Sequence, residues 1–466
     1  MGGFFGVTSK KDCVNDLFYG TDYHSHLGTR RGGLAVREQN GFKRFIHDIS
    51  NAQFRSKFEN DIDRLHGNMG IGVISDYEDQ PLIIGSHLGT YAIVTVGKIT
   101  NADEMVRTAF KKRTTHFSEM SDGEINPTEL VSTFINQGAT FEEGLQLAQE
   151  AIKGSCSILL LTENGIYASR DKLGRTPIVV GTKPGTTAVT LETCALPNLG
   201  YETKHYLGPG EIVLVTPDGF TQLKKPGKCL KICAFLWVYY GYPASCYEGI
   251  NVEQSRYRCG ACLAKRHKVK VDFVAGIPDS GTGHAIGYAT ATGLPYYRPF
   301  IKYTPTWPRS FMPTDQTVRE LVAVMKLIPI QDLIKGKRIL FCEDSIVRGT
   351  QLKDTIKRLY KNGAKEVHMR PACPPLLFSC KFLNFSRSKS EQDLAARRAI
   401  WEMEGAGKHN LRPYCRENSP QYNAMVERIR YRMGLTTLVY QKLDDLISAI
   451  GLPRKKICTY CWTGKE

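Results

Sequence analysis

The chain has 466 residues, 42% of them hydrophobic and 23% charged, and a formal net charge of +16. Its length suits two or three ordinary domains. It lacks the run of about 20 apolar residues that a membrane-spanning helix needs, and the basic start and apolar core of a signal peptide. The 62 basic residues form no long run, so we interpret the surplus as a solvated surface and expect neither a membrane nor a nucleic-acid partner.

The 14 cysteines point to a reducing compartment, because no secretion signal accompanies them. In such a compartment cysteines bind metals more often than they form disulfides. We therefore expect a cytoplasmic protein with a metal or cluster site.

The first half of the chain, to about residue 227, alternates short β-like runs with glycine-rich turns. Examples of the runs are 157–161 and 210–215, and apolar helical periodicity appears between them at 127–137 and 141–152. This mixture predicts an α+β domain with stacked sheets.

From about residue 272 the pattern changes to strand, loop, helix and strand. We expect strands at 273–277, 338–341 and 367–370, a helix at 285–292, and a second helix that runs to about 362. This order predicts an open parallel sheet that binds its ligand at the carboxyl ends of the strands. The more polar segment 386–435 is placed only as an insertion or cap.

One strand-to-helix connection carries specific chemistry. It reads Glu343-Asp344-Ser345-Ile346-Val347-Arg348-Gly349-Thr350. The backbone N–H groups of such a loop and of the helix start form an anion site. Two carboxylates would repel phosphate but suit sugar hydroxyls and Mg²⁺. An Asp N-cap on an ordinary turn would explain one acidic residue, not two, so we predict a phosphorylated sugar with a metal as ligand.

This octet resembles the signature of the type I phosphoribosyltransferases. Further segments follow in the order found in glutamine phosphoribosylpyrophosphate amidotransferases of purine nucleotide biosynthesis. In the second half they are 276–281 (GIPDSG), 287–289 (GYA), 293–296 (GLPY), Lys302, 319–320 (RE) and 326–327 (KL); in the first half they are 170–174 (RDKLG), 192–196 (ETCAL) and 208–211 (GPGE). The resemblance covers nearly the whole chain apart from roughly 386–435.

The resemblance implies an N-terminal-nucleophile-hydrolase-like αββα sandwich in 1–228 and an α/β type I phosphoribosyltransferase domain in 229–466. It implies that 5-phosphoribosyl-1-diphosphate (PRPP) and Mg²⁺ bind the second domain. The implied PRPP-binding residues are Asp279, Ser280, Gly281, Lys302, Glu343, Asp344, Ser345, Ile346, Val347, Arg348, Gly349 and Thr350. Ser280, Glu343 and Asp344 would contact the metal, and Lys302 would face the diphosphate. A homo-oligomer is also expected.

The sequence departs from the family pattern near the implied acceptor site. The first acidic residue of the octet is usually Asp and here is Glu343. The mobile loop after Lys302 contains Pro305, Trp307 and Pro308, and the flap reads YPAS at 242–245 where the family has RPDS.

The chemical positions of the family's glutaminase domain are also changed. In the family, a cysteine nucleophile attacks the glutamine amide, with its own α-amine as base. Gly2 takes the position of this cysteine here. The family's glutamine-binding Arg corresponds to Ser75, the oxyanion Asn to Val96 and the amine-binding Asp to Pro127. We therefore predict that the first domain does not hydrolyse glutamine.

Cysteine spacing suggests a metal centre at the end of the chain. Cys458 and Cys461 form a C-x-x-C motif, which can bring two thiolates to one metal or cluster. Cluster-bearing members of the family have this ending and two upstream cysteines, whose places Cys233 and Cys380 take, so the resemblance implies a structural [4Fe–4S] cluster. A zinc site that pairs Cys259 and Cys262 with the C-terminal motif is a lower-ranked alternative. Cys156, Cys194, Cys342 and Cys373 are interpreted as core residues in β-like segments.

Three functions remain open from the sequence. The leading hypothesis is an amidophosphoribosyltransferase that makes phosphoribosylamine from ammonia, or from an amine supplied by a partner. The second is a non-catalytic regulatory paralogue that binds PRPP. The third is a phosphoribosyltransferase with another acceptor.

Overall fold

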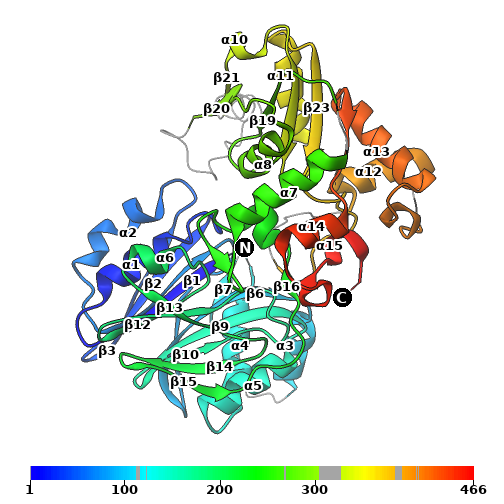
Figure 1. The fold of residues 1–466 in the computed structure, drawn as a ribbon. Helices are drawn as coiled ribbons and strands as arrows, with labels where there is room; N and C mark the ends of the chain where they lie inside the picture. The colour runs from blue at the N-terminus through cyan, green and yellow to red at the C-terminus, as the bar shows by residue number, and fades with distance from the viewer. Residues whose placement is uncertain are drawn as a thin grey trace.

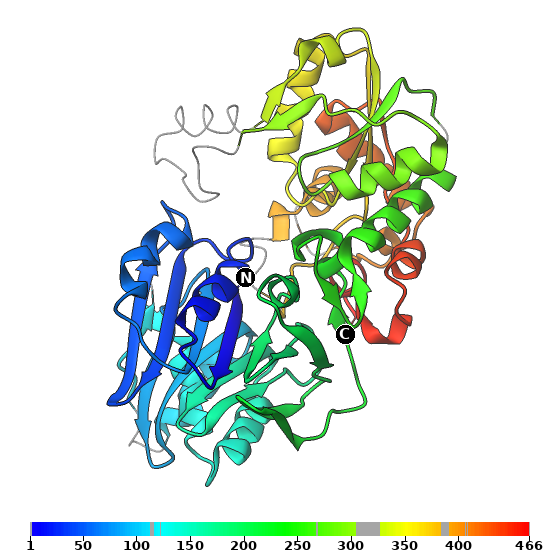
Figure 2. The same ribbon diagram turned by 60° about the vertical axis from the view of Figure 1, so that its left-hand side comes forward.

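The structure, a computed structural model, describes residues 2–111, 116–121, 123–266, 269–303, 327–383, 391–405, 407 and 409–465. Figure 1 shows two lobes, the first blue to green and the second green to red. Turning the molecule by 60° keeps the lobes apart and leaves the start of β1 at the end of the first lobe that faces the second (Figure 2).

The first lobe contains two stacked sheets. The first sheet has the strand order β13 (Glu202–Tyr206), β11 (Val179–Lys183), β12 (Thr186–Thr190), β1 (Gly3–Ser9), β4 (Met69–Ser75), β2 (Arg31–Glu38) and β3 (Gly41–Asp48). The second has the order β15 (Gly219–Lys224), β14 (Ile212–Thr216), β10 (Gly165–Ser169), β9 (Gly154–Thr162), β6 (Gly89–Ile99) and β5 (Leu82–Ser86). All pairings within both sheets are antiparallel.

Helices cover the outer face of each sheet. The covering helices are α1 (Val14–Asp22) and α2 (Phe54–Ile62) on the first sheet, and α3 (Ala102–Phe110), α4 (Pro127–Ile135) and α5 (Phe141–Ala151) on the second. The short helix α6 (Ala195–Asn198) and the hairpin of β7 (Met120–Ser121) and β8 (Glu124–Ile125) complete the lobe.

Strand alternation explains these layers. Phe4 packs in the core between the two sheets, whereas Phe5 packs under α1 and α2. Successive side chains of a strand point to opposite faces, so one strand supplies both cores. The result is the αββα sandwich that the sequence predicted.

The second lobe contains a four-stranded parallel sheet. Its order is β19 (Phe273–Gly276), β22 (Arg338–Glu343), β23 (Glu366–Pro371) and β24 (Thr437–Leu438). Helices α7 (Val252–Arg266) and α8 (Thr282–Thr292) cover one face, and α11 (Thr350–Lys361), α12 (Ala395–Glu404) and α13 (Pro420–Met433) cover the other. Leu340 and Phe341 face these two opposite cores, as strands buried on both faces do in parallel sheets.

Shorter elements connect this core to the rest of the chain. They are β16 (Ile232–Cys233), a π-helical turn η1 (Leu236–Tyr240), β17 (Cys246–Tyr247), β18 (Ile250–Asn251), β20 (Phe300–Lys302), β21 (Leu327–Pro329), α10 (Gln331–Ile334), η2 (Glu391–Asp393), η3 (Pro413–Cys415), α14 (Leu443–Ile450), η4 (Arg454–Lys456), β25 (Ile457–Cys458) and α15 (Tyr460–Thr463). No helix in the described ranges is long and apolar enough to cross a membrane.

The structure agrees with the expected strands and helices of both halves to within a few residues at their ends. The segment expected as an insertion or cap forms α12 and α13 and leads into β24. The last strand of the sandwich ends at Lys224 and β16 begins at Ile232, so the boundary at 228/229 lies in a connection and stays a prediction.

Candidate functional site

The carboxyl ends of two neighbouring strands bring the predicted PRPP loops together. In the parallel register Gly276 of β19 pairs with Cys342 of β22, so the loops that follow both strands leave the same edge. Ser280 Oγ from the first loop donates a hydrogen bond to Glu343 Oε1 at 3.1 Å. The Asp344 backbone N–H donates to the same oxygen at 3.0 Å.

The two carboxylates are buried side by side. Glu343 is 8% exposed and Asp344 6%. Burial and the neighbouring Asp344 raise the pKa of Glu343 well above its usual value. A cation bound here would relieve both effects, and a hydroxyl with two carboxylates is an all-oxygen set that suits Mg²⁺.

The loop after Asp344 leads directly into α11. Gly349 takes a left-handed conformation with φ of +74°, and α11 begins at the next residue, Thr350. The positive end of α11 thus lies at the end of the loop. Ser345 Oγ donates to Asp344 Oδ2 at 2.5 Å, and Ile346 is buried.

The segment before α12 covers this loop. The Ala395 N–H donates to the Val347 carbonyl at 2.7 Å, and Arg348 forms an ion pair with Asp393 at 3.7 Å. The segment 391–395 therefore acts as the cap that the sequence left undecided.

The loop after β19, which contains Asp279, Ser280 and Gly281, packs tightly against β22. A Cβ atom on Gly281 would lie 2.2 Å from the Cys342 carbonyl oxygen, so only glycine fits. The Pro278–Asp279 peptide is cis. Lys302 Nζ forms an ion pair with Asp279 Oδ2 at 2.5 Å, which places this lysine over the loop. Pro305, Trp307 and Pro308 lie outside the described residues.

Two of the altered glutaminase positions lie next to each other. A Cβ atom on Gly2 would lie 2.4 Å from the Ile74 carbonyl oxygen and 3.5 Å from the Ser75 Cα. Ser75 is buried, and its hydroxyl donates to Glu78 Oε2 at 2.7 Å. The Glu78 carboxylate thus lies beside Ser75, the position that the sequence analysis aligned with the glutamine-binding Arg of the family.

The other two positions that the sequence analysis singled out are Val96 and Pro127. The Val96 side chain is 3% exposed and packs in the core between the sheets. Pro127 is the first residue of α4, after the capping residue Asn126, whose side chain accepts from the Thr128 N–H at 2.9 Å. In place of a charged group, the start of α4 presents Thr128 Oγ1, which lies 2.7 Å from Thr95 Oγ1.

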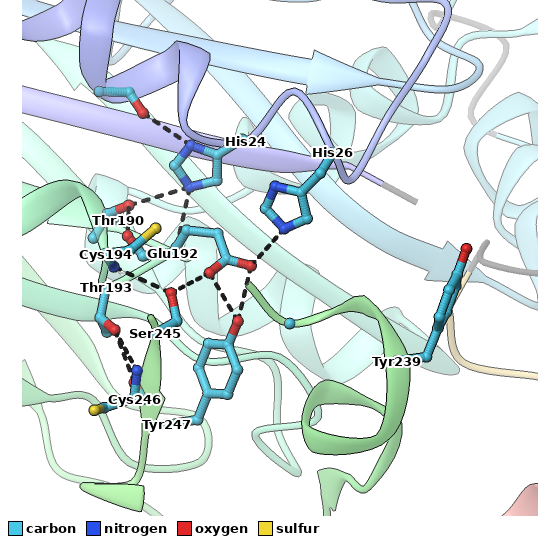
Figure 3. Close-up of polar contacts among 12 residues, drawn as sticks. His24, His26, Thr190, Glu192, Thr193, Cys194, Tyr239, Ser245, Cys246 and Tyr247 are labelled. Atoms are coloured by element: carbon cyan, nitrogen blue, oxygen red, sulfur yellow. Dashed lines mark hydrogen bonds and ion pairs between the residues drawn. The ribbon is translucent and has the colours of Figure 1, made fainter. Parts of the chain in front are cut away.

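A buried carboxylate links the two lobes (Figure 3). Glu192 is fully buried and lies 3.0 Å from His26 Nε2, and it accepts hydrogen bonds from Ser245 Oγ at 2.5 Å and Tyr247 OH at 2.8 Å. Burial alone would raise the pKa of Glu192, but His26 and the Ser245 hydrogen bond outweigh it, so this pKa is lowered. Ser245 is the last residue of the altered flap, so Glu192 anchors the flap to the first lobe.

This linking role was not predicted, although Glu192 stood in one of the family segments. Its partners come from distant parts of the chain, and no local spacing identifies them.

The four predicted cluster cysteines come together at the C-terminal end. Cys233 and Cys458 are register partners in the parallel pair of β16 and β25. The Cys461 thiol hydrogen-bonds to Cys380 and lowers the pKa of Cys380 to about 7. Cys233 and Cys458 contribute to the raised pKa of Cys461. Four thiols gathered in this way have the ligand chemistry of an iron–sulfur cluster.

The described side chains contain no group of three or more His, Cys, Asp or Glu residues arranged around one metal ion. A single zinc ion would require the sulfurs to meet within about 2.3 Å of one point. A cubane instead distributes its four ligands over four irons.

One residue that the sequence analysis did not identify contacts the four cysteines at Cys458. Arg175 Nη1 lies 2.9 Å from Cys458 Sγ. It follows the family segment 170–174 directly, but its partner lies at the other end of the chain.

The second C-x-x-C motif is used differently. Cys259 Sγ donates to the Ala372 carbonyl at 3.2 Å and contacts Gln441. Cys156 and Cys342 are buried strand residues as expected, whereas Cys194 is the buried capping residue of α6 and not part of a strand. Cys373 is buried just after β23.

Comparisons with known proteins agree with this arrangement. Residues 66–198 match the family model of the glutamine amidotransferase domain. The chain is 28% identical to an amidophosphoribosyltransferase of Methanocaldococcus jannaschii, over 100% of this chain and 97% of that protein. It is 27% identical to the Bacillus subtilis amidophosphoribosyltransferase, over 99% and 93%.

Solved structures give the same result. The structure of a glutamine PRPP amidotransferase from B. subtilis complexed with ADP and GMP is similar, with a TM-score of 0.85, 26% identity and coverage of 99% of this chain and 96% of that one. The predicted resemblance to this family and the predicted fold class are therefore confirmed.

Proposed function

We propose that this chain, a relative of the amidophosphoribosyltransferases of purine biosynthesis along its whole length, forms 5-phosphoribosylamine from PRPP and ammonia and does not hydrolyse glutamine. The observation that carries the transferase half of the proposal is the meeting of Ser280, Glu343 and Asp344 beside an anion loop. This arrangement combines a site for a cation with a site for a phosphate.

The residues have separable roles in the proposed reaction. The backbone N–H groups of 345–350 hold the 5-phosphate, with the N-terminus of α11 behind them. The carboxylates of Glu343 and Asp344 bind ribose hydroxyls and, with Ser280, Mg²⁺. When bound, the metal would neutralise charge on the diphosphate. Lys302, once released from its ion pair with Asp279, would contact the same diphosphate, which is the leaving group of the reaction.

The transfer step is a substitution at the anomeric carbon of PRPP. The nitrogen lone pair of ammonia forms the new C–N bond as the C–O bond to diphosphate breaks. Diphosphate leaves with the electron pair, and the excess proton on nitrogen passes to solvent.

The loss of glutamine hydrolysis rests on four positions at once. Gly2 supplies no nucleophile, Val96 supplies no oxyanion donor, and neither Ser75 nor Pro127 supplies a charge for the ends of glutamine. Loss of one oxyanion donor alone typically costs about 3–4 kcal/mol of transition-state stabilisation.

We also assign Cys233, Cys380, Cys458 and Cys461 as ligands of a structural [4Fe–4S] cluster. The support is their convergence from three separate parts of the chain. Their placement would tie the C-terminus to both ends of the second lobe.

Calorimetry with PRPP and Mg²⁺ tests the transferase site. The wild-type chain should bind PRPP in a Mg²⁺-dependent manner. Asp344→Asn should weaken this binding strongly because the variant keeps the shape of the side chain but loses its charge. The matched variant Asp354→Asn, on an exposed position of α11, should bind like the wild type. No binding of millimolar PRPP by the wild type would contradict the proposal.

A further inference from the structure

A basic pocket lies beside the C-terminal cysteine turn, away from the PRPP loops. It has a volume of about 470 Å³ and is lined by Arg175, Lys231, Arg454, Lys455, Ile457, Cys458, Thr459, Thr463 and Lys465. Five of these side chains are cationic and none is acidic. None of the PRPP-loop residues 279–281 or 343–350 contributes to it.

Arg175 forms the buried part of this pocket. It is only 1% exposed, and its guanidinium lies over the Phe382 ring at 3.3 Å from the centroid. Nη1 contacts Cys458 Sγ, but Nε has no hydrogen-bond partner among the described residues. A buried guanidinium N–H without a partner is costly, and Arg175 is one of the residues that line the pocket.

Most of the other cationic side chains that line the pocket form no ion pair with a described acidic residue. In the described ranges the ammonium groups of Lys231, Lys455 and Lys465 form no ion pair, and only Arg454 has an acidic partner, Asp444. Like charges that line one hollow repel each other. An anionic ligand would remove this repulsion.

The hydroxyls and the size of the pocket narrow the class of ligand. Thr459 and Thr463 also line the pocket. The Thr463 hydroxyl already donates to the Thr459 carbonyl at 3.0 Å, so Thr459 is the hydroxyl donor for a ligand, and a hydroxyl beside Arg and Lys is typical of phosphate sites. The volume is in the range of small-molecule sites. Because Arg454 is paired with Asp444, four cationic side chains are left without an acidic partner among the described residues. A single phosphate, with a charge of about −2, would leave about half of this charge uncompensated, whereas a diphosphate group meets more of it.

We propose that this pocket is a second anion site, which binds a small molecule that carries a diphosphate group. The bound ligand would join Arg175 of the first lobe to the turn that contains Cys458 and Thr459. It would thereby stabilise the C-terminal end next to the cysteine set. This inference does not depend on the activity proposed above.

Equilibrium dialysis with labelled inorganic diphosphate, in the absence of Mg²⁺, tests the site on the full chain with any cluster it carries. Three proteins are compared: the wild type, the pocket variant Lys455→Glu/Lys465→Glu, and the control variant Lys357→Glu/Lys365→Glu. All four lysines are exposed, and both variants change the net charge equally. Circular dichroism and the visible absorbance of each protein check that it is folded alike.

The wild type and the control should bind diphosphate alike, and the pocket variant at least about tenfold more weakly, as expected from the loss of one or more charge-assisted contacts. Inorganic phosphate should bind more weakly than diphosphate. ADP as a third ligand separates the two sources of the group: tighter binding of ADP identifies a nucleotide, and tighter binding of diphosphate identifies the free ion. Binding anywhere else would persist in all three proteins.

Equal diphosphate binding by all three proteins, or equal loss in both variants, would overturn the proposal. The same holds if the wild type binds no diphosphate. If the pocket variant misfolds, Lys231→Gln replaces it. This change removes one positive charge from the pocket and should also weaken diphosphate binding.

Discussion

Replacing Gly349 by alanine tests whether the anion loop depends on the backbone geometry seen here. The residue has φ of +74°, a conformation that costs an alanine about 1–2 kcal/mol. The added methyl group would also lie 2.3 Å from Met433 Cε, well inside contact distance. Overpacking typically costs roughly 1–3 kcal/mol, with the lower end expected here because a methionine side chain is adaptable. The two effects together amount to roughly 2–4 kcal/mol.

Gly293 offers a matched control. It has φ of +71° at the end of α8, but a Cβ atom there would meet nothing within 4 Å. Gly293→Ala should therefore show the backbone cost alone, about 1–2 kcal/mol, and keep the wild-type affinity for PRPP.

Chemical denaturation measures the stability of both variants, and calorimetry measures their binding of PRPP with Mg²⁺. Gly349→Ala should lose more stability than the control and bind PRPP at least about tenfold more weakly, since the loop must shift to relieve the clash. Wild-type affinity in Gly349→Ala, or equal destabilisation by both changes, would refute this account of the loop.

Four further predictions concern the pH dependence of binding, the pH dependence of stability, the cysteines and the nucleophile position. Because the pKa of Glu343 is raised and Mg²⁺ needs the ionised carboxylate, calorimetry should show Mg²⁺-dependent PRPP affinity falling as the pH is lowered; an affinity that does not change with pH would contradict this. Burial lowers the pKa of His24 from 6.5 to about 4, so the unfolded state gains the proton first and stability should fall as the pH drops from 6.5 towards 4. By linkage, protonation of His24 in the unfolded state lowers the free energy of unfolding by roughly 2 kcal/mol between pH 7 and pH 5. Chemical denaturation of His24→Gln should show a smaller loss of stability over this pH range. Anaerobically purified protein should contain about four irons per chain if the cluster is [4Fe–4S], and Cys458→Ser should reduce the iron content; stoichiometric zinc without iron would refute the cluster. Gly2→Cys should not create glutaminase activity, because its Cβ has no room beside the Ile74 carbonyl and the other groups are still missing; glutamate production by this variant would argue against that reasoning.

The anion loop was predictable because its signals are local. Strand, acidic pair, glycine and helix follow one another in 338–362, and the structure places them in that order on one edge of the sheet. The role of Ser280 was implied by the family resemblance, and its place beside Glu343 is explained by the parallel register of β19 and β22, since parallel strands end at the same edge.

Other features depend on packing between distant segments. Arg175 reaches Cys458, and Glu192 gathers His26, Ser245 and Tyr247, although no spacing in the sequence connects these residues. The segment 386–435 showed only helical character, and its role as a cover for the phosphate loop depends on the Val347–Ala395 backbone contact. Such contacts arise from the fold as a whole, so sequence periodicity does not reveal them.

Diphosphate release from PRPP and Mg²⁺, measured with either ammonium or glutamine as nitrogen donor together with an assay for glutamate, tests whether the chain uses ammonia in place of glutamine. We expect diphosphate release with ammonium, no release above background with glutamine, and no glutamate. Glutamate production by the wild-type chain, free of contaminating glutaminase, or a failure to release diphosphate with ammonium, would contradict this expectation.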